Sequence, residues 1–172
     1  MLPGYEIEVT GLDEQMALLE QEPFISHREL LEAMNRSVKT VEANVRPLTP
    51  VDRGRLRASI GSEIREEGLL SVVGRIGPSL KDELYPQVME FGREPGKFPP
   101  MEPIQAWVKR VIRPPEDQLR SIAFLIARKI AVKGIKPREY LKKGWEKSQE
   151  AVKRNFVQAV ERIAEALSNG NH

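Results

Sequence analysis

Prolines constrain the fold of this chain more than any other feature of its sequence. The chain has 172 residues and 13 prolines, and a proline inside a helix removes a backbone hydrogen bond and collides with the preceding turn. Pro23 and Pro47 bracket one apolar helical pattern, Pro103 and Pro114 bracket another, and Pro137 precedes a third. The sequence therefore predicts several separate helices.

The first 46 residues predict a short strand followed by two helices. Apolar and acidic residues alternate over Tyr5–Thr10, as in a strand with one buried face. Apolar residues recur at helical spacing over 12–19, which favours a short helix that ends at the first of these prolines. Ser26 and Glu29 then form a capping-box pattern, so we expect a second helix that runs to about Arg46.

In the middle of the chain the apolar pattern changes from a helical period to a period of two. Apolar or small residues occupy every second position over 58–64 and again over 70–76, and Glu67 and Gly68 lie between the two runs. This pattern predicts a β-hairpin over residues 55–77, with its turn at Glu67 and Gly68.

The remainder of the chain predicts a connector, a loop and three helices. We expect an aromatic-rich connector at Tyr85–Gly92 and a proline-rich loop at Arg93–Pro103. Apolar residues at helical spacing then predict helices that begin near Ile104 and Glu116, and a long final helix that reaches about Leu167.

These elements predict an α+β fold. A small antiparallel sheet, made of the hairpin at about 58–76 and the N-terminal strand, packs with several helices and a long C-terminal helix. A chain of this length buries roughly two-thirds of its unfolded surface, which suffices for a single domain over residues 1–172. Its parts are the N-terminal strand and helices (1–46), the hairpin (55–77), the connector and loop (82–103) and the helical C-terminal part (104–168).

The composition excludes several classes of protein. The chain has no cysteine, which excludes disulfide frameworks, thiolate zinc sites and thiol nucleophiles. His27 and His172 are its only histidines, so we expect no metal site and no cofactor. The longest uncharged part of the late apolar run is Ser121–Ala127, well short of the roughly 20 residues of a membrane helix. With no secretory signal at the N-terminus, we expect an intracellular chain without a membrane partner.

Charge is distributed unevenly, although the formal net charge is only +2. Residues 1–35 carry eight acids and one base, whereas residues 128–154 carry ten bases and three acids. These segments are either solvated helix faces or complementary surfaces that meet within one fold or between neighbouring subunits.

Groups able to perform catalysis are scarce. Asp82, Glu83 and Glu90 are the only carboxylates that we consider as a pair for hydrolysis without histidine, and no accompanying motif supports them. Trp107 and Trp145 lie on the apolar stripes of their helices, so we expect them to pack in the core. We therefore expect that the chain is not an enzyme.

Two basic clusters keep nucleic-acid binding open as an alternative, because phosphate contacts alone give affinity. No exposed aromatic residue interleaves with either cluster, and acids interrupt the second one at spacings that allow ion pairs within a helix. A solvated or subunit-facing surface is therefore favoured. The clusters are Arg53, Arg55 and Arg57, and Lys142, Lys143, Lys147, Lys153 and Arg154.

The segment Thr49–Ile60, TPVDRGRLRASI, has the properties of a junction between a helix and a strand. Asp52 can cap the next turn and is spaced to pair with Arg55. Gly54 permits a tight backbone, and Leu56 anchors the segment to the core.

The same segment resembles the tail-completion or minor tail component family of long-tailed bacteriophages. It is similar to that family's Pro-Val-Asp-Thr-Gly-Arg-Leu-Arg pattern, with Arg53 in place of the threonine. Residues 85–92, YPQVMEFG, resemble the family's Tyr-x-x-x-Val-Glu-Phe-Gly segment, with Met89 in place of the valine. Residues 134–141, GIKPREYL, are similar to the turn before its closing helix. The region around Trp107 is longer than in compact members of the family.

The resemblance implies a structural protein of the virion, in a bacteriophage or a prophage. Such proteins form the neck or the head-proximal end of the tail, where a ring joins the tail tube to the head connector. The implied partners are further copies of this chain, with six favoured, the tail tube or tail terminator, and the head-connector proteins. DNA would pass through the ring without specific binding. The implied location is the head-tail interface, and the host cytoplasm during assembly.

The resemblance does not separate tail completion, tail termination and head closure, and it supplies no catalytic residue. A closed ring needs two different complementary patches on each subunit, and the acidic and basic segments are candidates. The loop Arg93–Pro103, with Phe98 as an anchor, is another. The candidate interaction residues are Asp52, Arg53, Arg55, Arg57, Glu90, Phe91, Phe98, Lys142, Lys143 and Lys147.

Overall fold

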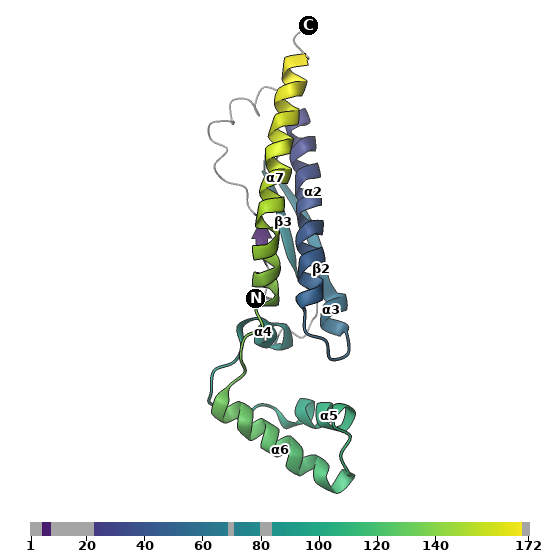
Figure 1. The fold of residues 1–172 in the computed structure, drawn as a ribbon, viewed down its shortest axis with the longest axis vertical. Coiled ribbons are helices and arrows are strands. Elements are labelled where there is room, and N and C mark those ends of the chain that lie inside the picture. The colour runs from purple at the N-terminus through teal and green to yellow at the C-terminus, as the bar shows by residue number, and fades with distance from the viewer. Residues whose placement is uncertain (1–4, 8–22, 69–70, 80–83, 170–172) are drawn as a thin grey trace. The chain divides into compact units, whose positions relative to one another are not determined.

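The computed structural model in Figure 1 contains helices and one small sheet, which confirms the predicted α+β class. No helix within the described part of the chain has the length and apolar character needed to cross a membrane. The structure describes residues 5–7, 23–68, 71–79 and 84–169.

The chain divides into two compact units. The first, here called the main unit, combines residues 1–90 and 139–172, and the second, here called the insert, is Phe91–Arg138. The chain therefore leaves the main unit once and returns to it once. That the two units form a single domain stays a prediction.

Two long helices form the centre of the main unit. Helix α2 spans Pro23–Leu48 and helix α7 spans Tyr140–Asn169, and they lie side by side (Figure 1). A Cβ atom on Gly144 would overlap the side chain and the backbone of Val45, so glycine allows the two helices to approach closely there. The buried apolar side chains of the pair are Leu30, Ala33, Met34, Val38, Val41 and Val45 in α2, and Tyr140, Leu141, Val152, Phe156, Ala159 and Ile163 in α7.

Side-chain hydrogen bonds hold the two helices in an antiparallel register. Asn44 Nδ2 donates to Ser148 Oγ at 2.9 Å, near the end of α2 and the start of α7. Asn155 Nδ2 donates to Ser37 Oγ at 3.1 Å, near the middle of both helices. A buried polar group without a hydrogen-bond partner destabilises the folded state. These pairs therefore also specify which residues of the two helices face one another.

Both ends of α2 differ from the prediction. The helix begins at Pro23, and Ser26 and Glu29 are buried inside it instead of forming a capping box at its start. Proline suits the first helical position because the N–H that it lacks has no partner there. The helix also continues through Pro47, and the carbonyl left without its usual donor belongs to the exposed residue Ala43, where water can reach it.

The sheet has the strand order β1-β3-β2, and both pairs of strands are antiparallel. In the central strand, Ile76 lies opposite Tyr5 on one side and Ser62 on the other. The Met34 and Val38 side chains of α2 fill the space that a Cβ atom on residue 74 would need, so the sheet packs directly on that helix. The strands are β1 (Tyr5–Ile7), β2 (Ile60–Gly68) and β3 (Ser71–Pro78).

The predicted hairpin is confirmed, but its first strand and its turn differ from the prediction. Residues Arg55–Ser59 form the short helix α3, so Ala58 is helical and β2 begins at Ile60. Gly68 belongs to β2 and pairs with Ser71, so the predicted turn at Glu67 and Gly68 is wrong. The predicted N-terminal strand is confirmed over the three residues of β1, and its remainder and the helix predicted over 12–19 lie outside the described residues.

The predicted connector after the hairpin is partly helical. Helix α4 spans Leu84–Phe91, and its buried residues Pro86 and Glu90 are four positions apart on one side. An eight-residue helix shows only two turns of this spacing, which is too short a pattern to stand out in the sequence.

The insert consists of a loop and two helices that pack against each other. Helix α5 spans Met101–Val111, so it begins inside the predicted loop Arg93–Pro103, three residues before the predicted start. Helix α6 spans Glu116–Lys133 and begins where predicted. Trp107 is 37% exposed, which contradicts the prediction that it lies in the core. The apolar stripe of α5 is wider than the surface that α6 covers. Trp145, in contrast, packs against the core of the main unit as predicted.

Candidate interaction sites

The residues that carry the family resemblance gather at one end of the helix pair. Because α2 and α7 are antiparallel, the end of α2 lies beside the start of α7, where Val45 meets Gly144. The first motif follows α2 directly in the chain, Glu90 of the second motif binds the start of α7, and the third motif runs into α7 at Tyr140. Figure 1 shows α3 and α4 together at this end, which is here called the motif end.

In the first motif, Arg57 satisfies the carbonyl groups that α2 leaves without donors at its end. Its guanidinium donates to the carbonyl of Thr49 at 3.2 Å and to that of Pro47 at 3.5 Å. Basic side chains near a helix C-terminus stabilise it through such bonds and through the helix dipole. Arg57 therefore contributes to the structure through these bonds, although it is exposed, as Arg53 and Arg55 are.

The predicted capping role of Asp52 is wrong. The residue before α3 is Gly54, and no side chain caps that helix. Gly54 has a φ of 74°, a conformation that glycine adopts without strain, and its carbonyl accepts the first backbone bond of the turn, from Ala58. Asp52 itself is exposed in the preceding loop.

Glu90, from the second motif, caps the start of α7. Its carboxylate accepts hydrogen bonds from the backbone N–H groups of Leu141 at 2.9 Å and Lys142 at 3.1 Å. The first N–H groups of a helix have no partner within the helix, and the helix dipole favours negative charge at this position. Glu90 is only 2% exposed, so it is a buried structural contact rather than a surface residue.

This arrangement does not favour the carboxylate pair that we considered as a hydrolytic site. Each carboxylate oxygen of Glu90 is bound by a backbone donor, which leaves it poorly placed to accept a proton from a substrate. Asp82 and Glu83 lie outside the described residues. The absence of enzymatic activity stays a prediction.

Two tyrosines lie near the Glu90 carboxylate. Burial raises the pKa of Tyr140 far above its ordinary value, and the charge of Glu90 adds to this shift. Burial and then Glu90 also raise the pKa of Tyr5. The hydroxyl of Tyr140 has no hydrogen-bond partner within the described part of the chain. The surroundings of the cap therefore keep both phenols protonated.

Inside the insert, the residue that directly follows the second motif pairs with the backbone of the third motif. Arg93 and Ile135 exchange two backbone hydrogen bonds, each of 2.8 Å, and form an isolated antiparallel bridge. Gly92 has a φ of 76°, and a Cβ atom there would overlap the carbonyl of Ile135 and the ring of Pro137. The Gly92 position therefore requires glycine for two separate reasons.

Of the predicted basic residues on α7, two are bound to a neighbouring acid. Lys142 and Lys143 each lie near Glu139, at 3.4 Å and 3.5 Å. The hydrogen bond to Glu139 raises the pKa of Lys142, and the same bond lowers the pKa of Glu139. Lys147 is exposed further along the helix.

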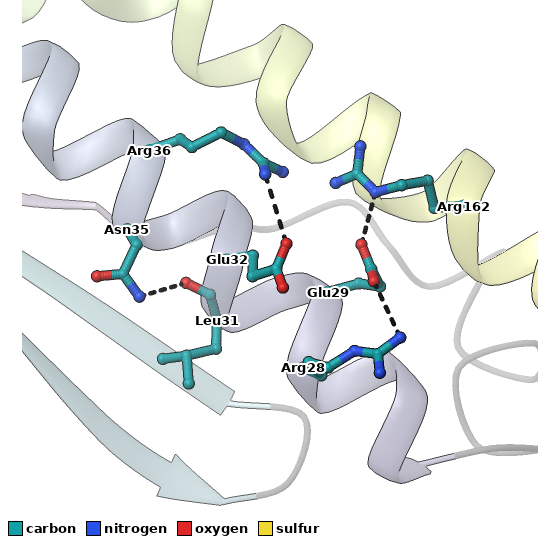
Figure 2. Close-up of polar contacts among 7 residues, drawn as sticks. All are labelled: Arg28, Glu29, Leu31, Glu32, Asn35, Arg36 and Arg162. Atoms are coloured by element: carbon teal, nitrogen blue, oxygen red, sulfur yellow. Dashed lines mark hydrogen bonds and ion pairs between the residues drawn. The ribbon is translucent and has the colours of Figure 1, made fainter.

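The acidic N-terminal segment also uses part of its charge inside the main unit (Figure 2). Arg162 of α7 donates to Glu29 at 2.6 Å, and Arg28 donates to its other oxygen at 3.5 Å. The bond from Arg162 lowers the pKa of Glu29 although burial opposes the shift. Glu32 pairs with Arg36 at 3.6 Å. These contacts satisfy two acids of the segment locally.

The two aromatic candidates are both exposed. Phe91 is 68% exposed, and Phe98 is 47% exposed although its ring stacks on that of Phe124 of α6, with 5.5 Å between the ring centroids. Phe124 was not predicted from the sequence as a candidate, and neither were Leu125 and Val132, which are 60% and 65% exposed. One signal in the sequence does indicate them, because the apolar residues of α6 are distributed all round the helix and not along one stripe.

No group of three or more acidic or histidine side chains in the described ranges is placed to bind a metal ion. Comparisons with protein-family models, with curated proteins and with solved structures find no match. The candidate sites are therefore argued from their own geometry.

Proposed function

We propose that this chain is a structural subunit of a bacteriophage head-tail joint, most simply a ring that links the tail tube to the head connector. The observation that carries this proposal is the convergence of the three motifs at one end of the helix pair. Segments 49–60, 85–92 and 134–141 are far apart in the sequence, yet the first caps the end of α2 and the second caps the start of α7, which the third segment supplies. A resemblance to a family is more specific when its motifs contribute to one local structure than when they lie in separate parts of the fold.

The charge distribution also supports a subunit that binds copies of itself. A closed head-to-tail ring requires two different surfaces that complement each other. The main unit contains 21 acids and 16 bases, whereas the insert contains four acids and 11 bases. Each subunit thus offers both an acidic and a basic part. We propose six copies, the tail terminator or tube and the head connector as partners, and the head-tail interface as the location.

Deletion of the coding sequence from the genome that carries it tests this function directly. After induction, we expect electron microscopy to show filled heads and tails that have not joined, and expression of the chain from a plasmid should restore joined particles. Joined, infectious particles without the chain would contradict the proposal.

Nucleic-acid binding is the second candidate function, because the insert carries a net charge of +7. A surface that binds phosphates predicts an affinity for a DNA duplex that falls steeply with salt. A titration of the full chain with a labelled duplex at two salt concentrations separates the candidates. Strong binding at physiological salt would favour this alternative over the joint.

A further inference from the structure

The insert exposes a stripe of apolar side chains on α6. Ala123 and Ala127 are buried where α6 packs against α5. Leu125 and Val132 are seven residues apart, so they share one side of the helix, and they are 60% and 65% exposed. A helix that is apolar all round is normally buried all round. The α6 stripe is therefore a surface without its expected cover.

The insert is also too small to bury these residues by itself. It has 48 residues, and its fully buried apolar side chains in the described structure are Val108, Ala123 and Ala127. Units of this size rarely hold together on such a core and normally gain stability from a partner. Cover for the α6 stripe would supply that stability.

The charge around the α6 stripe indicates what covers it. Arg128 and Lys129 lie between Leu125 and Val132 in the sequence and are both exposed. The net charge of the insert is +7, and that of the main unit is −5. The main unit of a second copy therefore complements the insert almost completely in charge, and it is present at the same concentration.

The second half of α7 offers a surface of the matching kind. Val157, Glu161 and Glu165 are four residues apart in turn, so they lie along one side of the helix, and all three are exposed. Neither glutamate has an ion-pair partner within the described part of the chain. At the same end of the helix pair, Phe24 of α2 is 75% exposed. This surface, here called the acidic end of α7, combines apolar and acidic groups.

We propose that the α6 stripe of one copy docks on the acidic end of α7 of the next copy. Val157 and Phe24 cover Leu125 and Val132, while the two glutamates face the basic side chains of α6. The contact joins two different surfaces, so it repeats head to tail and can close into a ring. This inference deepens the proposed joint and rests on it for its biological meaning. A duplex or an anionic membrane is a poorer occupant, because both would repel the tethered main unit, with its charge of −5.

The test uses two double variants of the full chain, each with a matched control. Leu125→Asp with Val132→Asp disables the stripe. Its control is Val111→Asp with Ile112→Asp, at apolar residues of the insert that are 50% and 45% exposed and lie outside the stripe. Glu161→Lys with Glu165→Lys disables the acidic end. Its control is Glu146→Lys with Glu150→Lys, at exposed residues with the same spacing on the first half of α7. All targeted side chains are exposed, so circular dichroism should show unchanged folding.

Sedimentation velocity then measures association from about 1 to about 100 µM protein. We expect the wild type and both controls to associate, and each double variant alone to associate at least about tenfold more weakly. Mixed in equal amounts, the two double variants should form a 1:1 dimer that grows no further, because the mixture retains one intact stripe and one intact acidic end. Higher salt should weaken the wild-type contact.

Three results would overturn the docking. One is a wild type that stays monomeric throughout, another is a mixture that stays monomeric while the wild type associates, and the third is a pair of double variants that associate like the wild type. If rings form in that third case, the docking fails while the proposed joint stands. The deletion experiment judges the joint separately, because it does not depend on which surfaces meet.

Discussion

The main unit and the insert bury their apolar side chains to very different extents. The core of the main unit joins fourteen buried apolar residues from both long helices, the sheet and α3. In the described part of the insert, three apolar side chains are fully buried, while α6 alone exposes Phe124, Leu125 and Val132. Both regions show apolar residues at helical spacing. Helical spacing of apolar residues therefore identifies the side chains that can be buried. Whether they are buried depends on the elements that pack against that helix.

The largest expected effect tests whether the two regions are stabilised separately. Met34→Ala removes a fully buried side chain from α2, and we expect it to lower the free energy of unfolding of the main unit by about 3 kcal/mol. Val108→Ala removes two carbon atoms from the insert, which should cost about 1.5 kcal/mol there. Hydrogen exchange measured by mass spectrometry reports both regions in one experiment. If Val108→Ala also raised exchange throughout α2, the separation would be wrong.

The second prediction concerns the main unit with and without the Glu90 cap of α7. Glu90→Ala leaves two N–H groups of α7 without their acceptor, so we expect a loss of about 2 kcal/mol in the free energy of unfolding. Glu90→Gln keeps one acceptor oxygen and should lose about half as much. Urea denaturation followed by circular dichroism measures both. Equal losses in the two variants would show that the carboxylate contributes by packing and not by capping.

The contact between Glu29 and Arg162 predicts how the helix pair responds to acid. The pKa of Glu29 is lower in the folded chain than its ordinary value of 4.5, so its contribution is present above that pH and is lost as the pH falls through the folded pKa. Glu29→Gln should therefore cost about 1.5 kcal/mol at pH 7. The difference between wild type and variant should shrink below about pH 4.5. A difference that stays constant down to pH 2, measured by urea denaturation, would refute this role.

The smallest effect concerns the turn between the two helices of the insert. Arg113 has a φ of 53°, which most residues adopt at a cost and asparagine adopts more readily. Arg113→Asn should therefore raise the free energy of opening of the insert by about 0.5 kcal/mol. Arg110→Asn, inside α5, is the control and should lower it by a similar amount. Hydrogen exchange at α5 and α6 would report both changes, and equal signs would contradict the strain argument.

Much of the fold could be predicted because long elements repeat their pattern many times. The periodicity of α7 and α6 and the alternation of the hairpin were sufficient for that reason. The start of α2 could not be predicted, because Ser26 and Glu29 match a capping box, while the partner of Glu29 is Arg162, which is 133 residues away in the sequence. Local patterns cannot reveal such a distant contact.

The candidate interaction residues also fall into two groups, those that the sequence indicated and those that it did not. Glu90 stood out as an acid within a motif, but its role depends on the backbone of Leu141, which is 51 positions further along the chain. Phe98 was recognised because its loop is rich in proline, whereas Leu125 and Val132 were assigned no role. Their exposure depends on how many other elements pack against α6. The sequence of α6 alone cannot predict this.

The hydrogen bond from the Glu139 amide to the Glu90 carbonyl, 3.2 Å long, has a further consequence. It shows that the chain leaves the main unit and returns to it at adjacent points, so a linker of two or three residues would span the same gap. We therefore expect that removing, lengthening or exchanging the 48 residues between them leaves the packing of α2 on α7 unchanged. The insert is in this sense an exchangeable module, through which related chains could change partners while they keep one scaffold.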